Sequence, residues 1–188
     1  TTRQLQLFNA TTKGCGGLRS SANSAAIIAW PATHQDWVRP GLILYGASPL
    51  LNQSARQLEL LVVMNFYSRI IVIKQVKKGE AVGYGGSWVA TKDILLGVIS
   101  IGYGDGYPRY AKPGTPVLIN KQRVPLVGRV SMDMITVDLT GHTGIKTGDQ
   151  VLLWGAGLPV EEIAGYADTI PYTLLCGITR RVQVIVKK

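Results

Sequence analysis

From about residue 58 onward, the chain consists of short apolar segments separated by turn residues, and this pattern constrains the fold more than any other feature. The segments are rich in β-branched and aromatic residues, which favour strands. They lie at 58–80, 81–90, 93–106, 115–140, 148–157 and 181–188. A turn near Asn120-Lys121 divides the fourth segment, which is expected to form two or three strands. Many short strands at regular spacing are typical of a barrel-like β domain.

Two short helices are expected near the C-terminus. PVEEIAGYAD, at 159–168, has a proline at its start and acidic residues in its first turn, and both features favour a helix N-terminus. IPYTLLCGITRR, at 170–181, is predicted as a second helix. RVQVIVKK, at 181–188, is predicted as a closing strand because apolar residues alternate along it.

The first fifty residues have a different pattern, in which helix-like and strand-like segments alternate. Leu42 to Tyr45 is a four-residue apolar run between glycines, as expected for a buried parallel strand or its end. ASPLLNQSARQ, at 47–57, is interpreted as a linker. This part of the chain is therefore predicted to be α/β.

The charge of the chain permits an anionic partner but does not favour one. The formal net charge is +9, from 20 basic and 11 acidic residues, and such a balance is compatible with nucleic acid or phosphate binding. The basic residues are scattered, however, and their close groups are Lys74, Lys77, Lys78 and the terminal Lys187, Lys188. Scattered lysines are typical of a solvated face. No apolar run approaches the roughly 18 residues of a membrane span. We therefore expect neither a nucleic-acid nor a membrane partner.

Several common catalytic sites are not indicated. The sequence has neither a phosphate-binding G-x-x-x-x-G-K-[ST] loop nor a G-x-S-x-G nucleophile elbow. His34 and His142 are isolated, and Cys15 and Cys176 lack metal-type spacing, so no metal site is predicted. Two reduced thiols are the expectation for a cytoplasmic protein.

The segment ISIGYGDGYPRY, at 99–110, ends a strand in a glycine-rich turn. Asp105-Gly106 is ordinary turn chemistry, whereas Gly102 and Gly104 are not needed for that turn. They remove bulk on both sides of Tyr103, which indicates that something approaches the phenol closely. The alternative is a tight turn with a surface aromatic side chain.

Arg39-Pro40-Gly41 is a candidate anion site. A glycine at the end of a strand allows backbone N–H groups to approach an anion, and a neighbouring arginine adds positive charge. The alternative is a simple turn at the end of a strand.

Four segments together closely resemble bacterial alanine racemase. They are ANSAA at 22–26, DWVRPGLILYGASPL at 36–50, GYGDGYPR at 102–109 and VGRVSMDMITVDL at 127–139. VGYGGSWVA and GDQVLLWG fit the same pattern, and the resemblance runs across essentially the whole chain. It implies a mainly β chain, in which a C-terminal β-barrel-like domain at 55–188 follows the last part of a truncated (β/α)8 barrel at 1–50.

The resemblance also implies a pyridoxal 5'-phosphate enzyme that interconverts L- and D-alanine. Racemisation needs acid–base groups on both faces of the substrate. The resemblance assigns one face to a lysine that binds the cofactor and the other to Tyr103, with the flanking glycines expected to let a flat adduct lie against the phenol. That lysine belongs to a K-A-N-A-Y-G-H-G segment that the 188 residues do not include, so the chain alone is expected to be inactive.

Further site residues follow from the same resemblance. Ser24, with the N–H groups of Gly41 and Leu42, matches the phosphate site, and Arg39 matches the arginine that faces the pyridine nitrogen. An arginine does not readily release a proton, so it is expected to keep that nitrogen unprotonated and to limit transamination. Met132 matches a residue that contacts substrate.

Three more expectations follow from the resemblance. Asp133 is expected to support the loop of Met132. Some members of the family carry a tyrosine near the C-terminus that reaches the phosphate, and this chain has Arg180 there, which is not counted as a site residue. The implied enzyme is a homodimer in which the β domain of one subunit completes the other subunit's site. Its implied role is to supply D-alanine for the cell wall or to take part in alanine catabolism.

The sequence is also compatible with three other hypotheses about function. One is a racemase of broader amino-acid range. Another is a basic β-barrel binding module, which would need aromatic residues flanked by basic residues on one strand face. A third is a chain that serves only as an interaction domain.

Overall fold

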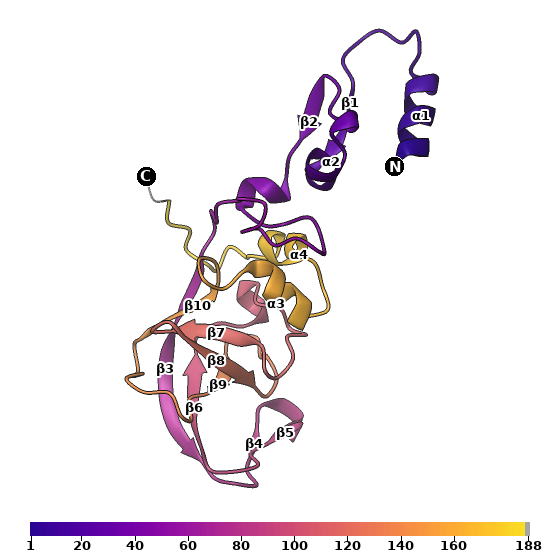
Figure 1. Cartoon of the computed structure of the whole chain (residues 1–188). Helices are drawn as coiled ribbons and strands as arrows, with labels where there is room; N and C mark the ends of the chain where they lie inside the picture. Colours follow the sequence, from indigo (N-terminus) through magenta and orange to yellow (C-terminus); the bar gives the residue numbers. More distant parts are fainter. Residues whose placement is uncertain (187–188) are drawn as a thin grey trace. The chain divides into compact units, whose positions relative to one another are not determined.

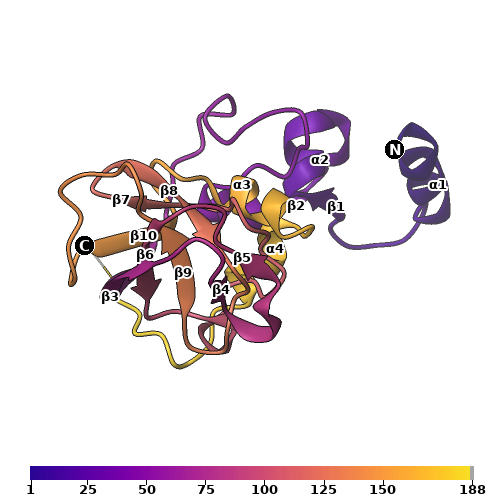
Figure 2. The ribbon, with the colours of Figure 1, turned by 90° about the horizontal axis from the view of Figure 1, so that it is seen from below.

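The computed structural model describes residues 1–186. It divides into two compact units, one of residues 1–61 and one that begins at Val62. Figures 1 and 2 show the ribbon in two views.

The second unit is built on a closed antiparallel barrel of six strands. The strands are β3 (Phe66–Val76), β6 (Ile94–Ile99), β7 (Pro116–Ile119), β8 (Gln122–Val127), β9 (Ile135–Asp138) and β10 (Gln150–Trp154). They pair in the order β10-β3-β6-β9-β8-β7, and β10 also pairs with β7. Closure pairs the backbone N–H and C=O groups that the edge strands of an open sheet would expose. The expectation of a mainly β, barrel-like C-terminal domain is confirmed.

The inside of the barrel is apolar because inward and outward residues alternate along each strand. In β9, Ile135 and Val137 are buried, whereas their neighbours are only partly covered. Trp154 is fully buried at the end of β10, where its ring packs 4.6 Å from Phe66 and 6.3 Å from Tyr107 between centroids. Complete burial raises the pKa of the Tyr107 phenol, because the charged form would be desolvated there.

Shorter elements lie at the two ends of the barrel (Figure 1). At one end a hairpin of β4 (Ala81–Val82) and β5 (Trp88–Val89) pairs Ala81 with Val89. At the other end lie α3 (Val160–Tyr166) and α4 (Pro171–Cys176). No helix in the described part of the chain is long and apolar enough to cross a membrane.

Most of the predicted elements of this unit are found, but the closing strand is not. The turn at Asn120-Lys121 joins β7 to β8, with φ of 49° and 64° at its two residues, as a two-residue hairpin of the primed type requires. Residues 181–186 form no strand, so that prediction is wrong for them, and residues 187 and 188 lie outside the described part. The barrel is already closed through β10, which leaves no edge for a further strand.

The first unit contains one pair of parallel strands. Its elements are α1 (Thr2–Thr11), β1 (Ser20–Asn23), α2 (Ser24–Ala29), β2 (Trp37–Arg39) and 3-10 turns at Pro31–Thr33 and Leu42–Tyr45. Strands and helices alternate here as predicted. All three residues of β2 are exposed, although strands of parallel sheets are ordinarily buried.

The apolar run Leu42–Tyr45 is a single 3-10 turn and not a strand, so that prediction is wrong. The turn ends at Gly46, whose φ of 76° is accessible to glycine. The Gly46 N–H donates to the carbonyl of Ile43, and the Ala47 N–H donates to the carbonyl of Leu42. An apolar run of four residues cannot by itself distinguish a buried strand from one helical turn.

Candidate active site residues

The register of β1 and β2 brings the first group of candidate residues together. Asn23 lies opposite Arg39 in the parallel pair. Ser24 directly follows Asn23, and Gly41 lies two residues after Arg39, so all of them are at the carboxyl ends of neighbouring strands. Enzymes built on parallel barrels bind phosphate at that end.

Ser24 and Gly41 converge on one point. The Ser24 Oγ accepts the Gly41 N–H at 2.8 Å, and Ser24 is only 1% exposed. The Gly41 N–H is bonded to the hydroxyl oxygen, so the Ser24 hydroxyl hydrogen is the one of the two donors that remains for an anionic oxygen. Asn23 supports this geometry, because its Oδ1 accepts the Ala26 N–H at 3.0 Å at the start of α2. These groups fit the phosphate of pyridoxal phosphate.

Arg39 and Leu42 complete the first group. The Arg39 guanidinium donates from one nitrogen, Nη1, to the carbonyl of Ser20 at 2.6 Å and to its Oγ at 2.8 Å. Its side chain is thereby directed by β1, and Arg39 is exposed. Leu42 is 2% exposed and begins the 3-10 turn, so its backbone follows directly on that of Gly41.

The second group belongs to the other unit and centres on Tyr103. Tyr103 begins a 3-10 turn, Tyr103–Asp105, that follows β6. The Asp105 Oδ2 accepts the N–H of Gly102 at 2.9 Å, and this hydrogen bond joins the last residue of the turn to the residue that precedes it. Tyr103 is 42% exposed, so a ligand can reach the phenol.

Backbone hydrogen bonds join the Tyr103 turn to the loop of Met132. The Tyr103 N–H donates to the carbonyl of Ser131 at 3.0 Å, and the Gly104 N–H donates to the carbonyl of Met132 at 2.9 Å. The Ser131 Oγ, which donates to the carbonyl of Met134 and accepts its N–H, holds the loop in a tight turn. Met132 is 50% exposed. The structure thus places Tyr103 and Met132 side by side.

The glycines beside Tyr103 are explained by this junction. A Cβ on Gly102 would collide with the backbone of Ser131 and Met132. A Cβ on Gly104 would collide with the Arg181 guanidinium and would lie 3.0 Å from the Met132 carbonyl oxygen. The close approach inferred from the glycines is therefore real, but the groups that approach are a loop and a side chain of this same chain. The expectation that the glycines make room for a ligand is corrected in this respect.

Arg109 lies over the ring of Tyr103, with its guanidinium carbon 5.4 Å from the ring centroid. Its Nη1 donates to the carbonyl of Val130 at 3.4 Å. This arrangement is a cation–π contact, and it orients the ring between Arg109 and the neighbouring loop.

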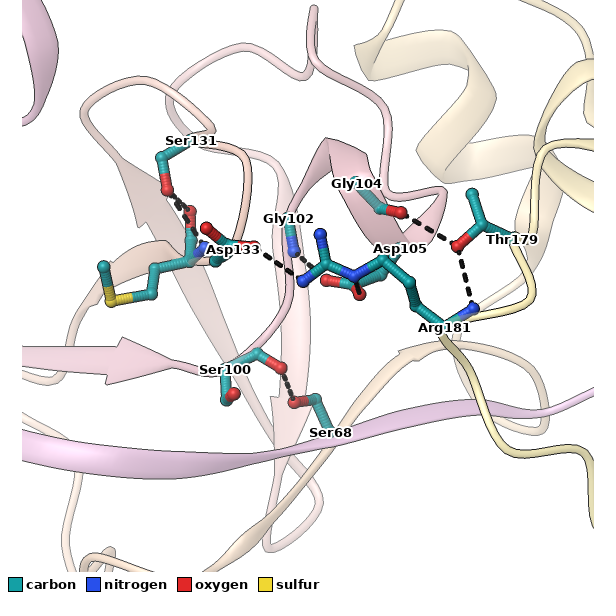
Figure 3. A network of polar contacts seen from close by, with 10 residues as sticks. Ser68, Ser100, Gly102, Gly104, Asp105, Ser131, Asp133, Thr179 and Arg181 are labelled. Atoms are coloured by element: carbon teal, nitrogen blue, oxygen red, sulfur yellow. Dashed lines mark hydrogen bonds and ion pairs between the residues drawn. The ribbon is translucent and has the colours of Figure 1, made fainter.

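Arg181 is the functional candidate that sequence reasoning missed. Its Nε lies 3.1 Å from the Asp105 Oδ1, and its Nη2 donates to the Asp133 Oδ1 at 2.6 Å, as Figure 3 shows. The resemblance had pointed to the adjacent Arg180, which is exposed. The sequence signal was the pair of arginines at 180–181, but a pair alone does not indicate which one turns toward Tyr103.

The described residues, 1–186, contain no group of three or more histidine, cysteine or acidic side chains that could hold a metal ion. Cys15 and Cys176 are both free and exposed.

Comparison with known proteins identifies the family. The family model described as "Alanine racemase, C-terminal domain" matches residues 63–186, and that described as "Alanine racemase, N-terminal domain" matches residues 1–49. Alanine racemase of Vibrio cholerae serotype O1 is 52% identical over 184 residues, which are 98% of this chain and 51% of that protein.

Solved structures agree. The structure of biosynthetic alanine racemase from Pseudomonas aeruginosa superposes with a TM-score of 0.93 at 47% identity and covers 97% of this chain and 51% of that one. Alanine racemase from Bartonella henselae with covalently bound pyridoxal phosphate gives a TM-score of 0.87 at 31% identity, over 98% of this chain and 51% of that one. The chain spans about half the length of the relatives it matches. The agreement of both family models and of these relatives shows that the chain belongs to the alanine racemase family.

Proposed function

We propose that this chain is the C-terminal part of a pyridoxal-phosphate-dependent alanine racemase that interconverts L- and D-alanine. In this proposal residues 1–50 are the end of the (β/α)8 barrel, and residues 55–188 are the β domain. The exposure of every residue of β2 supports it, because a parallel strand of this kind is ordinarily covered within a larger sheet.

In the first unit, Ser24, Gly41 and Leu42 would bind the cofactor's phosphate. The 2.8 Å hydrogen bond from the Gly41 N–H to the Ser24 Oγ supports this role, because it holds both residues together at the ends of parallel strands. Arg39 would donate to the pyridine nitrogen through guanidinium N–H groups other than those of Nη1, which is bonded to Ser20.

In the second unit, Tyr103 would move the proton on one face of the substrate. Pyridoxal phosphate, when bound, supplies a conjugated ring that makes the α-proton of an amino acid acidic. The Tyr103 phenol takes that proton from the α-carbon, or returns one to it, and the group on the opposite face does the reverse. The Met132 carbonyl is engaged by Gly104, so its N–H is the backbone donor that would bind the substrate carboxylate.

The proposed enzyme is a homodimer in which Tyr103 and Met132 act on a cofactor held by the partner's barrel. We place it in the cytoplasm, supported by the two free, exposed cysteines, which suit a reducing compartment. The D-alanine that the enzyme forms would be used in peptidoglycan precursors, or the reverse conversion of D-alanine to L-alanine would serve alanine catabolism.

The observation that carries this proposal is the junction of a half-exposed Tyr103 with the Met132 loop, within the domain that the family model matches. The test uses what we call the completed enzyme, in which this chain is joined to the part of the Vibrio cholerae relative that it does not match. With added pyridoxal phosphate it is expected to racemise alanine.

Tyr103→Phe in the completed enzyme is the matched control, since it retains the ring and removes the ionisable oxygen. A folded completed enzyme that binds the cofactor but does not racemise alanine would overturn the proposal. The same assay with serine and lysine as substrates measures whether the enzyme is selective for alanine or of broad range.

A further inference from the structure

We propose that Arg181 is a positioning residue, which holds the turn of Tyr103 and the loop of Met132 in a fixed relation by binding one carboxylate from each. The catalytic consequence of this role rests on the proposed function. The contacts themselves do not.

The guanidinium of Arg181 bridges two segments that are distant in the sequence. Its Nε pairs with the Asp105 Oδ1 at 3.1 Å, and its Nη2 with the Asp133 Oδ1 at 2.6 Å. Asp105 closes the Tyr103 turn through its other oxygen, and Asp133 directly follows Met132. The planar fork of arginine has the geometry to span two carboxylates, which the single ammonium of lysine lacks.

The backbone of the C-terminal segment is also attached to the Tyr103 turn. The Thr179 Oγ1 donates to the carbonyl of Gly104 at 2.8 Å, and the Thr179 N–H donates to the carbonyl of Asp105 at 3.3 Å. The Arg181 N–H in turn donates to the Thr179 Oγ1 at 3.3 Å. Figure 3 shows Thr179 and Arg181 on one side of the turn and Asp133 across from them. The backbone from which the Arg181 side chain extends is therefore fixed to the Tyr103 turn.

The space for the guanidinium is provided by Gly104. Any Cβ at that position would collide with Nη1 of Arg181. The absence of a side chain beside Tyr103 thus serves the bridge, and the same glycine donates its N–H to Met132.

The charges are consistent with a positioning role and not with a large contribution to stability. The Arg181 side chain is 45% exposed, and exposed ion pairs contribute little to folding. The hydrogen bond to Asp133 raises the pKa of Arg181, so the guanidinium keeps its positive charge throughout the neutral pH range. Without Arg181, two carboxylates on facing loops would repel each other.

Amide hydrogen exchange on the 188-residue chain tests the bridge itself. Arg181→Met is expected to speed exchange of the Tyr103 and Gly104 amides about 10-fold or more, because these N–H groups cross the junction that the bridge holds. Amides of β6 and β9 should be unchanged. Arg123→Met is the matched control, since it removes another exposed arginine that pairs with a carboxylate, that of Glu162.

Two further variants strengthen this test. Asp133→Asn in the Arg181→Met background removes the repulsion between the carboxylates, so it should restore part of the protection. If Arg181→Met does not fold, the same exchange measurement is made on Arg181→Lys. This variant keeps the charge but cannot span both carboxylates. Unchanged exchange at Tyr103 and Gly104 in the folded variant would overturn the inference.

Kinetics of the completed enzyme test the catalytic consequence. Arg181→Met should lower kcat by about 10-fold to 100-fold, since small misplacements of a reacting group have effects of this size. Cofactor binding, read from visible absorption, should be unchanged, and Arg181→Lys should recover part of kcat. An unchanged kcat together with faster exchange would overturn the positioning role. If the unsubstituted completed enzyme is inactive, the proposed function fails, while the exchange experiment still decides whether Arg181 holds the junction.

Discussion

Tyr103 is held in place by its backbone and by its neighbours more than by bonds of its own side chain. Its N–H reaches Ser131, and Arg109 lies over its ring. Tyr103 is thus a well-supported residue that remains 42% exposed. This arrangement predicts that the ring stays in place when the oxygen is removed.

In the completed enzyme, Tyr103→Phe should slow exchange of the α-proton of L-alanine with deuterated water by about 10²–10⁴-fold, the usual contribution of a general acid–base group. If the cofactor lysine serves the D face, D-alanine should still exchange, without inverting. Racemisation must slow in both directions because the equilibrium between the enantiomers cannot change. Tyr110→Phe, at a tyrosine that is 82% exposed, should leave both rates as they were. Equal loss for both enantiomers would mean that Tyr103 only shapes the site.

Arg39→Glu in the completed enzyme should raise transamination relative to racemisation. A carboxylate beside the pyridine nitrogen favours its protonation and strengthens the ring as an electron sink. The measurement is the ratio of pyruvate formed to alanine racemised. An unchanged ratio would show that Arg39 does not face the nitrogen.

At this scale the sequence indicates some candidate residues and misses others. Tyr103 and Met132 could be named from a motif because each lies within a short, distinctive segment. Arg181 could not, because its partners Asp105 and Asp133 lie 76 and 48 residues earlier and meet it only after the barrel has formed. A long-range ion pair leaves no local signal in a single sequence.

At the scale of elements, the outcome depended on how local the determining interactions are. The β7–β8 hairpin was predictable because its two-residue turn fixes the register of both strands. The apolar run at 42–45 and the alternating tail at 181–186 have patterns that suit strands, but neither finds a partner strand. A strand exists only where a neighbour offers hydrogen bonds, and pattern alone cannot supply that neighbour.

Gly102→Ala should destabilise the second unit by about 1–3 kcal/mol, the usual effect of forcing extra atoms into a packed contact. The new methyl group would meet the backbone of Ser131 and Met132, which cannot swing aside as a side chain can. Denaturant unfolding measures the change. Gly165→Ala is the matched control with the opposite expected sign, because Gly165 lies in α3 with open space around it and alanine favours helices. Equal stability of Gly102→Ala and the unsubstituted chain would contradict this close packing of Gly102 against the Met132 loop.

Asp93 links the end of β3 to the start of β6 and gives the fold a pH-dependent contact. The Lys78 N–H and the Lys77 ammonium, both 2.9 Å from its oxygens, lower the pKa of the Asp93 carboxyl. Its contribution to stability is therefore present above the unfolded value of about 3.9 and is lost as the pH falls through the lower folded value. Asp93→Asn should lower the Tm at pH 7, and the difference should shrink below about pH 4. A difference that is the same at pH 7 and at pH 3 would mean that charge at Asp93 is not involved.

At the scale of the whole molecule, the two units carry different halves of the proposed chemistry. The first unit contains the groups that fit a phosphate, and the second contains the phenol and the loop that would contact substrate. The β character of the second unit was predictable because short apolar segments separated by turns follow one another from about residue 58. The arrangement of strands around the barrel was not, since it depends on pairings between distant segments.

The 188-residue chain alone, with added pyridoxal phosphate, should neither racemise alanine nor acquire the visible absorption of a covalently bound cofactor. Its sequence does not include the lysine segment that the family resemblance requires. The completed enzyme serves as the positive control under the same conditions. Turnover by a 188-residue chain of verified mass would show that another residue replaces that lysine.

The way in which the barrel closes has a consequence for synthesis on the ribosome. Strand β10, at Gln150–Trp154, pairs with both β3 and β7, so the last strand to be made joins the first strand of the barrel to its other open edge. Until it emerges, nascent β3 and β7 present unpaired backbone groups, which are the usual template for aggregation. Contacts this distant in the sequence also slow folding. A nascent chain that has emerged from the ribosome through β9 but not yet through β10 would therefore be the most chaperone-dependent form of this protein, and emergence of β10 would end that dependence.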